Sequence, residues 1–255
     1  MMLLHDKVAI VTGAASPRGI GLATARLLAE HGARVLLLDL DATAAEQAAA
    51  SLVAGGTEPR HAAARCDVTD ADQCRAAAVL AQRRFGRIDV LVNIAGVTSP
   101  QRLMEVTPES YARIMDVNVR GTVNMTQAVV PAMRAQRAGS IVNMSSVSAQ
   151  RGGGVFGGSH YSAAKAAVLG YTKAAARELG PDNIRVNAVC PSYIDTDIAG
   201  DAMTAERLQQ IVASAPMGRV GHAHEVAGCI LFLASDLASY VTGSEIDVNG
   251  GSHIH

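Results

Sequence analysis

The sequence predicts a doubly wound α/β fold, in which helices cover both faces of a mainly parallel, seven-stranded sheet. Short apolar runs rich in Val and Ile alternate with amphipathic segments along the whole chain. Strands that are apolar along most of their length belong to parallel sheets buried on both faces. Because strand and helix alternate repeatedly, right-handed crossovers are expected to wind the chain into two helical layers.

The apolar runs predict the strands in order along the chain. They are Val8–Thr12, Arg34–Leu40, His61–Asp67, Asp89–Asn93, Ser140–Met144, Arg185–Cys190 and Glu245–Val248. The amphipathic segments between them predict the helices, which are Ile20–Glu30, Ala42–Leu52, Ala71–Phe85, Pro108–Arg134, Tyr161–Leu179 and His224–Ala234. Gly32, Gly86 and Gly180-Pro181 follow the first, third and fifth helices as stop signals. No Pro- or Ser-rich linker interrupts the series, so residues 1–255 are expected to form a single domain.

Composition narrows the class of protein. Of the 255 residues 49% are hydrophobic, which excludes a disordered chain. The 22 basic and 23 acidic residues nearly cancel and create no field that would attract nucleic acid or an anionic membrane. The first residues lack the pattern of a signal peptide, and no apolar run approaches the roughly 18 residues that span a bilayer. We therefore expect a cytoplasmic protein that binds neither nucleic acid nor membrane.

The cysteines and histidines predict no disulfide and no metal site. The four cysteines form no C-x-x-C pair and are expected to be free thiols; they are Cys66, Cys74, Cys190 and Cys229. Two His-x-His pairs lack an acidic or cysteine partner at ligand spacing and are expected on the surface; they are His222 with His224 and His253 with His255.

A glycine-rich turn follows the first expected strand and opens the first expected helix. It contains Gly13, Gly19 and Gly21. Glycines allow the backbone to turn tightly against a pyrophosphate, and the helix N-terminus offers unpaired N–H groups and the positive end of its dipole. Because the turn lies between a strand and a helix, with an acidic residue at the end of the next strand, it is interpreted as a dinucleotide-binding turn.

The acidic residue after the second strand bears on the choice of dinucleotide. Asp39 can accept hydrogen bonds from both ribose hydroxyls of NAD and would repel the 2′-phosphate of NADP. Arg18 acts in the opposite direction, because a cation beside the turn can pair with that phosphate. Repulsion at close range favours NAD, with NADP as the second choice. A helix N-cap is the alternative role for Asp39, and Asp41 is better placed for it.

Tyr161 and Lys165 lie four residues apart and therefore share one face of the fifth expected helix. A phenol with a pKa near 10 is a poor base at neutral pH, and a nearby ammonium favours the phenolate. The preceding strand ends in Met144 and is followed by Ser145 and Ser146. Hydroxyls at the carboxyl end of such a strand lie where ligands bind, and there a serine can hydrogen-bond a substrate carbonyl.

With these features together, the sequence resembles the short-chain dehydrogenase/reductase family, whose domain is of the Rossmann type. The resemblance extends from Lys7 to Gly251. Besides the glycine-rich turn it rests on Asp67-Val68, Asn93-Ile94-Ala95-Gly96, Asn118, Ser146, Tyr161 with Lys165, Pro191 to Thr196, and Tyr240-Val241-Thr242-Gly243. It implies a homotetramer, with the long fourth and fifth helices in one interface and the C-terminal strand region in another.

The resemblance also implies catalytic roles. Tyr161 is expected to be the general acid/base, and Lys165 to lower its pKa and hold the nicotinamide ribose. Ser146 is expected to orient the substrate oxygen. Asn118 is expected to support a water that links Lys165 to bulk solvent. The reaction is then hydride transfer between a nicotinamide and a carbinol or ketone carbon.

Further positions are implied as cofactor contacts. Asp67 is expected at the adenine amino group, Val68 at its backbone contacts, and Thr196 at the carboxamide or pyrophosphate. The full expected set, with Tyr161 and Lys165, is Gly13, Ser16, Arg18, Gly19, Ile20, Gly21, Asp39, Asp67, Val68, Asn93, Ala95, Gly96, Pro191, Ile194 and Thr196.

The sequence departs from the family pattern at four places. The glycine-rich turn carries the additional pair Pro17-Arg18, Ile94 stands for the usual second Asn, and Ser192 stands for a Gly. The glycine-rich segment between Ser146 and Tyr161 is also longer than usual. Counting back from Tyr161 therefore selects Ser148 instead of Ser146; the rigid strand favours Ser146.

Substrate contacts are expected from the loop after Ser146 and from a mobile lid over about residues 192–216. The candidates are Ser148, Phe156 and Tyr193. The function expected is hydride transfer between NAD and a secondary alcohol or ketone, such as a polyol, a sugar or a hydroxy acid. Two alternatives stay open: an NADPH-dependent reductase of 3-oxoacyl thioesters, and a non-catalytic protein that senses NAD.

Overall fold

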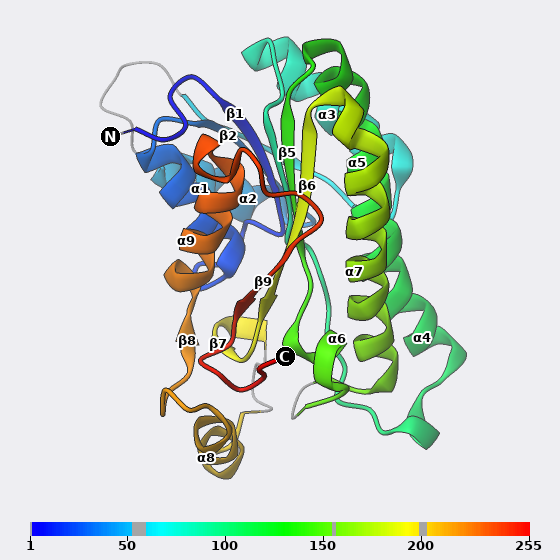
Figure 1. Ribbon diagram of the computed structural model, residues 1–255. Helices are drawn as coiled ribbons and strands as arrows, with labels where there is room; N and C mark the ends of the chain where they lie inside the picture. The colour runs from blue at the N-terminus through cyan, green and yellow to red at the C-terminus, as the bar shows by residue number, and fades with distance from the viewer. Residues whose placement is uncertain (1, 53–59, 155–156, 199–202) are drawn as a thin grey trace.

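A parallel seven-stranded sheet forms the centre of the molecule (Figure 1). The computed structural model describes residues 2–52, 60–154, 157–198 and 203–255. The strand order is β3-β2-β1-β4-β5-β6-β9. In chain order these strands are β1 (Val8–Thr12), β2 (Arg34–Asp39), β3 (Ala62–Arg65), β4 (Val90–Asn93), β5 (Gly139–Met144), β6 (Ile184–Pro191) and β9 (Glu245–Val248). The predicted doubly wound fold is confirmed, and the order reverses between β1 and β4, where such folds bind ligands.

Helices cover both faces of the sheet, with α1, α2 and α9 on one side and α3, α5 and α7 on the other (Figure 1). The α-helices are α1 (Ile20–Glu30), α2 (Ala42–Ser51), α3 (Ala71–Phe85), α4 (Pro108–Met115), α5 (Gly121–Gln136), α6 (Val147–Arg151), α7 (Ser159–Leu179), α8 (Ala205–Ser214) and α9 (Ala223–Ala234). None of the helices within the described ranges is long and apolar enough to cross a membrane.

Side chains of the central strands alternate between two apolar layers. In β1, Ala9 and Val11 pack in the cluster that contains α1 and α9 residues. Val8 and Ile10 pack in the opposite cluster, with side chains of α3, α5 and α7. Because successive strand residues point to opposite faces, a strand buried on both sides reads as a continuous apolar run. This explains why apolar runs located the strands correctly.

The long helix expected over Pro108–Arg134 is interrupted. It consists of α4, a π-helical turn over Asp116–Arg120, and α5, which continues to Gln136. A π turn adds a residue to the helical repeat and is often found at functional sites. Apolar periodicity does not distinguish such a turn from regular helix, so the expectation of one uniform helix was wrong at this point.

Two helices and a small second sheet were not predicted. α6 follows Ser146, whose side chain caps its N-terminus by accepting a hydrogen bond from the Ser148 N–H at 3.1 Å. α8 has Thr204 as its N-cap. The short strands β7 (Ile194–Asp195) and β8 (Gly221–His222) pair in parallel. The five residues of α6 and the two-residue strands are too short to show hydrophobic periodicity, whereas the ten residues of α8 fall in the segment that was expected to form the lid.

Candidate active site

One cavity of ≈ 910 Å³ opens at the carboxyl ends of the strands. In strand order across the sheet, it is lined after β3 by Asp67, at β2 by Asp39, after β1 by Gly13, after β4 by Ile94, after β5 by Ser145 and after β6 by Ser192. This edge, beside the reversal between β1 and β4, is the position where doubly wound sheets bind dinucleotides.

The glycine-rich turn is packed too tightly for side chains. Gly13 has φ +65°, and a Cβ there would lie 2.9 Å from the backbone of Ala95. A Cβ on Gly21 would lie 2.1 Å from the carbonyl oxygen of Gly13. The N-cap of α1 is Gly19, which supplies no side-chain hydrogen bond to the helix end. The first N–H groups of α1 therefore face the cavity as donors for an anion, as a pyrophosphate site requires.

Asp39 lies on the wall of the cavity at the end of β2. Its Oδ2 accepts a hydrogen bond from the Ala15 N–H at 3.0 Å, which ties β2 to the glycine-rich turn. The N-cap of α2 is Asp41, which accepts from the Ala44 N–H at 2.9 Å. The helix-cap alternative for Asp39 is therefore excluded, as the sequence argument expected.

Arg18 does not take the position predicted for it. Among the described residues it is not one of those lining the cavity. Its guanidinium instead donates to Asp195 Oδ1 at 2.5 Å and lies 3.7 Å from Asp197 Oδ1. The neighbouring hydroxyl of Ser16, which lines the cavity as predicted, donates to Asp197 Oδ2 at 2.8 Å. Two carboxylates distant in sequence compete for the cation that the sequence argument had assigned to a phosphate.

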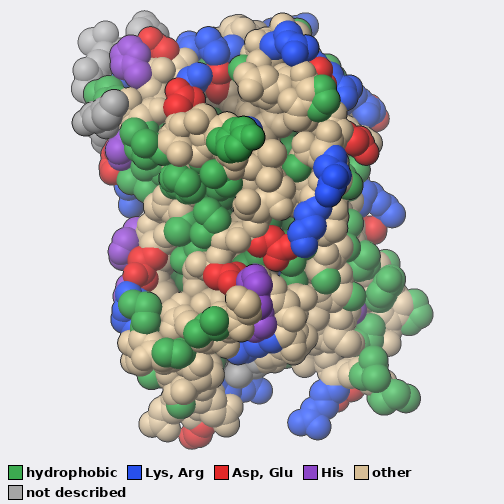
Figure 2. Space-filling view, in the orientation of Figure 1, with side chains coloured by type: hydrophobic (Ala, Val, Ile, Leu, Met, Phe, Trp, Pro, Cys, Tyr) green, Lys and Arg blue, Asp and Glu red, His purple; other side chains and the backbone are tan. Residues whose placement is uncertain are grey.

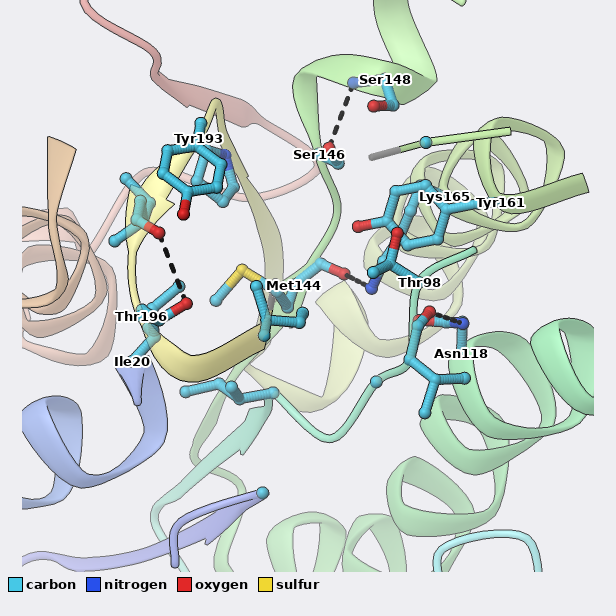
Figure 3. A pocket seen from close by; sticks show the side chains of 18 of the residues that line it. Ile20, Thr98, Asn118, Met144, Ser146, Ser148, Tyr161, Lys165, Tyr193 and Thr196 are labelled. Carbon is cyan, nitrogen blue, oxygen red and sulfur yellow. Dashed lines mark hydrogen bonds between the residues drawn. The ribbon is translucent and has the colours of Figure 1, made fainter. Parts of the chain in front are cut away.

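The predicted catalytic side chains lie together on one wall of the cavity (Figure 3). Ser146 follows β5 and Tyr161 lies on α7, and Ser146 is close enough to the phenol to favour its ionised form. The hydroxyl of Ser145 is instead bound to the backbone carbonyl of Lys165 at 2.9 Å. Ser148 also lines the cavity, and a Cβ on Gly157 would lie 2.8 Å from its Oγ and 3.0 Å from Tyr161 Cδ1, so both serines lie near the tyrosine.

Lys165 lies below Tyr161, one helical turn further along α7. Its side chain is buried, and Nζ donates to the carbonyl oxygen of Met144 at 2.8 Å (Figure 3). Nζ is 5.8 Å from the centre of the Tyr161 ring. Burial lowers the pKa of Lys165 to about 8. At pH 7 the ammonium is therefore favoured by about tenfold, far less than for an exposed lysine.

Burial raises the pKa of Tyr161, and nearby Ser146 acts in the opposite direction. The expected lowering of this pKa by Lys165 is not found among the protein groups alone. Nζ donates instead to the strand carbonyl of Met144 and lies 5.8 Å from the centre of the Tyr161 ring.

Asn118 lies in the π turn between α4 and α5. Its Nδ2 donates to the carbonyl oxygens of Val97 and Ile114, both at 2.9 Å. Its Oδ1 is buried and accepts no hydrogen bond from the described residues. A Cβ on Gly96 would lie 2.8 Å from this Oδ1 and 3.4 Å from Lys165 Nζ. The unpaired oxygen, the ammonium and the bare glycine thus border one polar space, and a buried acceptor of this kind usually holds a water.

Most other predicted cofactor residues also line the cavity. They are Ile20, Val68, Ala95, Gly96, Pro191, Ile194 and Thr196. Asn93 was predicted to contact the cofactor, but it is not among the described residues that line the cavity. It is buried in the sheet, and its Nδ2 donates to Asn143 Oδ1 at 2.9 Å. Asn143 in turn donates to Thr172 Oγ1 at 2.9 Å. A residue at the strand end points to one face or the other, and this one joins a buried polar ladder beneath the site.

The predicted substrate residues are only partly placed. Ser148 and Tyr193 line the cavity, whereas Phe156 lies outside the described residues. Within the expected lid, Ile211 and Ser214 of α8 line the cavity, so this helix forms part of its wall.

Several lining residues were missed from the sequence. They include Thr98, Arg113, Arg219 and Ser252. Ser252 reaches the cavity from beyond β9, and no local motif marks such a residue. Arg219 is held by Glu225 through two hydrogen bonds of 2.8 and 2.7 Å, which lowers the pKa of that carboxyl to about 2. The spacing of six residues between Arg219 and Glu225 could have suggested an ion pair, but it does not predict that Arg219 lines the cavity.

Comparisons with known proteins agree with this architecture. Residues 13–253 match a protein-family model described as enoyl-(acyl carrier protein) reductase. An uncharacterized short-chain type dehydrogenase/reductase of Sinorhizobium fredii is 52% identical, with all of both chains aligned (100% and 100%). A 3-oxoacyl-[acyl-carrier-protein] reductase of Thermotoga maritima is 43% identical over 98% of this chain and 99% of that one. The crystal structure of a short-chain type dehydrogenase/reductase from Mycobacterium marinum superposes with a TM-score of 0.92 at 36% identity, over 99% and 97% of the two chains.

Proposed function

Given that the chain belongs to the short-chain dehydrogenase/reductase family and is an NAD(P)-dependent oxidoreductase, we propose that it transfers a hydride between NAD and a secondary alcohol or ketone. The observation that carries this proposal is the convergence of Ser146, Tyr161 and Lys165 on the wall of the cavity that also contains the glycine-rich turn. A dinucleotide bound along the strand ends would bring its reactive ring to these side chains.

The residues present fit a dinucleotide. The bare backbone of Gly13 and Gly21 and the uncapped start of α1 suit a pyrophosphate. Asp39 would hold the adenosine ribose, and Asp67 with Val68 would border the adenine. Lys165 would hold the second ribose, next to Pro191, Ile194 and Thr196. When bound, the nicotinamide supplies or accepts the hydride.

Tyr161 would move the substrate proton. In alcohol oxidation its phenolate takes the hydroxyl proton, and in ketone reduction its phenol donates one to the carbonyl oxygen. Ser146 would hydrogen-bond the same oxygen and steady its developing charge. Because burial alone raises the pKa of Tyr161, the phenolate needs cationic support. Lys165 can supply it only while its own amine, with a pKa of about 8, stays protonated.

Asn118 would return the proton to solvent. Its unpaired Oδ1 and Lys165 Nζ border the same polar space beside Gly96. A water bound there would accept from Lys165 and donate to Asn118, which satisfies the orphaned oxygen. Asn118 lies in the π turn, and its Nδ2 is anchored on the carbonyls of Val97 and Ile114, which holds the amide in place for this role.

NAD is favoured over NADP by two features of the described residues. The carboxylate of Asp39 lies on the cavity wall, where it would repel a 2′-phosphate. The cation that could have compensated, Arg18, is already paired with Asp195 and Asp197. Tight NADP binding would require both the loss of the Asp39 charge and the release of Arg18 from its carboxylate partners.

The cavity favours a substrate with an apolar flank. Apolar side chains line it beyond the catalytic group, among them Val97, Val147, Ile198, Ile211 and Val220. A sugar or polyol would bury several hydroxyls in a cavity that these side chains share with polar ones such as Arg113 and Ser252, and each hydroxyl left unpaired costs about 1–3 kcal/mol. We therefore favour secondary alcohols and ketones that have few hydroxyl groups.

A 3-oxoacyl thioester reductase is the second candidate. The Thermotoga maritima relative carries that name, and the apolar wall would accept an acyl chain. This activity normally uses NADPH, and the carboxylate of Asp39 would oppose binding of its 2′-phosphate. A third possibility, a binding protein that senses NAD without chemistry, is disfavoured by the complete group of Asn118, Ser146, Tyr161 and Lys165.

One screen separates these candidates. Purified protein is incubated with NAD or NADP and with alkyl secondary alcohols, polyols, hydroxy acids or 3-hydroxyacyl thioesters, and the reduced cofactor is followed by absorbance. We expect the highest kcat/KM with NAD and an apolar secondary alcohol. Higher kcat/KM with NADP and a 3-hydroxyacyl thioester would select the second candidate. Tight NADH binding without any turnover would support the sensor.

We also propose that copies of this chain associate in the cytoplasm as a homotetramer. Exposed apolar side chains support this, namely Leu103 and Met104 just before α4, Tyr111 on α4, and Leu237 and Tyr240 before β9. Figure 2 shows hydrophobic side chains gathered at the lower right edge, where Figure 1 has α4. Light scattering on a size-exclusion column tests it: Met104→Asp and Tyr240→Asp should each reduce the mass, and a monomeric wild type would contradict it.

A further inference from the structure

Two segments far apart in the sequence are joined beside the cavity. The additional pair in the glycine-rich turn brings Arg18 to Asp195 and Asp197, and Ser16 donates to Asp197 as well. We call these four side chains the clasp: Ser16, Arg18, Asp195 and Asp197. The three polar contacts join segments about 180 positions apart in the sequence. Unlike an ion pair within one helix, they tie one wall of the cavity to another.

The far side of the clasp begins at a fixed point. Ile194 is buried in the apolar core, and its strand β7 pairs with β8, where the Gly221 N–H donates to the Tyr193 carbonyl at 3.1 Å. Beyond this anchor, Thr196, Asp197 and Ile198 line the cavity. The clasp therefore holds the first residues after the anchor.

The position of the clasp has an electrostatic consequence. Asp197 lines the same cavity as Gly13 and the start of α1, where the pyrophosphate would bind. A bare carboxylate there would repel the cofactor phosphates. Arg18 contacts both carboxylates and offsets one of their two negative charges, which weakens the repulsion toward an anionic ligand.

We propose that the clasp is a positioning device that retains the cofactor: it holds residues 194–198 against the glycine-rich turn and must open before the dinucleotide leaves. The proposal rests on the cofactor site of the proposed function, although not on the identity of the substrate. Arg18 then acts through the segment that it holds and does not itself contact the cofactor.

The test measures the dissociation rate of NADH. The chain has no Trp, so the fluorescence of bound NADH is followed directly while an excess of NAD displaces it in a stopped-flow instrument. Arg18, Asp195 and Asp197 are each about half exposed, and an exposed pair contributes up to about 1 kcal/mol, which is about fivefold in a rate constant. Arg18→Ala should raise the dissociation rate by about that factor. Arg75→Ala, which removes a comparably exposed pair with Asp72 on α3, should leave it unchanged.

A second variant separates the clasp from simple charge compensation. Arg18→Ala leaves two uncompensated carboxylates, whereas Arg18→Ala/Asp195→Asn/Asp197→Asn removes the clasp and the repulsion together. The proposal predicts that NADH still dissociates fast from the triple variant, and that Arg18→Lys, which keeps the charge, restores part of the retention. A wild-type dissociation rate in the triple variant, or in Arg18→Ala, would overturn it.

Failure of the proposed function is distinguishable from failure of the clasp. If the protein prefers NADP, the same displacement is run with NADPH and NADP, and the predicted ratios between variants stay the same. If it turns over no alcohol, NADH retention is still measurable. Unaltered thermal unfolding of each variant, checked by circular dichroism, shows that a changed rate does not come from loss of the fold.

Discussion

The Nζ atom of Lys165 donates a 2.8 Å hydrogen bond to the carbonyl oxygen of Met144, the last residue of β5. The bond ties the middle of α7 to the strand end from which Ser146 follows. The backbone carbonyl of Lys165 also accepts from Ser145, so strand and helix are joined twice at this point. The distance between Ser146 and Tyr161 is therefore set by the sheet, and the longer glycine-rich segment between them does not alter it.

Replacement of the phenol at Tyr161 tests the acid/base assignment. Tyr161→Phe should lower kcat by at least about 10²-fold, because proton transfer by a positioned side chain contributes that much or more. The NADH dissociation constant should stay nearly unchanged, since the ring is kept. Tyr171→Phe on the same helix, outside the cavity, is the matched control and should retain activity. A Tyr161→Phe enzyme with most of its activity would refute the assignment.

Removal of one charge at Asp39 tests the cofactor preference. Asp39→Asn keeps an oxygen that can accept from the Ala15 N–H but loses the repulsion toward a 2′-phosphate. The ratio of kcat/KM for NAD to that for NADP should fall by about tenfold or more, because close like charges cost several kcal/mol. Asp41→Asn, at the cap of α2, should leave the ratio unchanged. A wild type that already prefers NADP would contradict the interpretation of Asp39.

The pKa of about 8 for Lys165 predicts how activity depends on pH. Burial disfavours the ammonium, so this lysine loses its proton well below the usual pH near 10.5. For ketone reduction, kcat/KM should fall as pH rises above about 8, with the limb reporting the coupled Lys165–Tyr161 pair. The measurement is kcat/KM with NADH between pH 6 and 10. Lys173→Met, at an exposed lysine of the same helix, should keep the limb. A flat profile up to pH 9.5 would show that Lys165 is not the group responsible.

His61 predicts a loss of stability in mild acid. Its Nδ1 accepts from the Val35 N–H at 3.2 Å, and burial first, then Arg60, lowers its pKa. The unfolded chain therefore binds the proton more readily below about pH 6.5, so stability falls as pH drops through that value. At one unit below, the loss is at most ~1.4 kcal/mol.

His61→Asn checks this in urea unfolding at pH 7.5 and 5.5. The Asn side-chain oxygen can accept from Val35 without titrating, so the difference between the two pH values should shrink. His5→Asn, at an exposed histidine, should not change it. An equal acid-induced loss in wild type and His61→Asn would mean that other groups cause it.

The sequence by itself determined the layers of the fold and the centre of the site. Apolar runs and amphipathic periods are local, and they mark strands buried on both faces and helices packed on one. The spacing of Tyr161 and Lys165 is also local, because four residues along a helix always share a face. The glycine-rich turn was recognised from its place between a strand and a helix, and its close packing against Ala95 leaves no room for a side chain at Gly13.

Only the tertiary structure decided which partner each polar group finds. Arg18 pairs with carboxylates near residue 195, Asn93 turns into the sheet toward Asn143, and Lys165 faces Met144. The π turn at Asn118 and the approach of Ser252 to the cavity were likewise unforeseen. Hydrogen bonds and ion pairs form only when segments far apart in the chain are placed to within a few tenths of an ångström of each other's required position. Sequence periodicity contains no such distances, so it can place a side chain on a face but cannot name the atom that it meets.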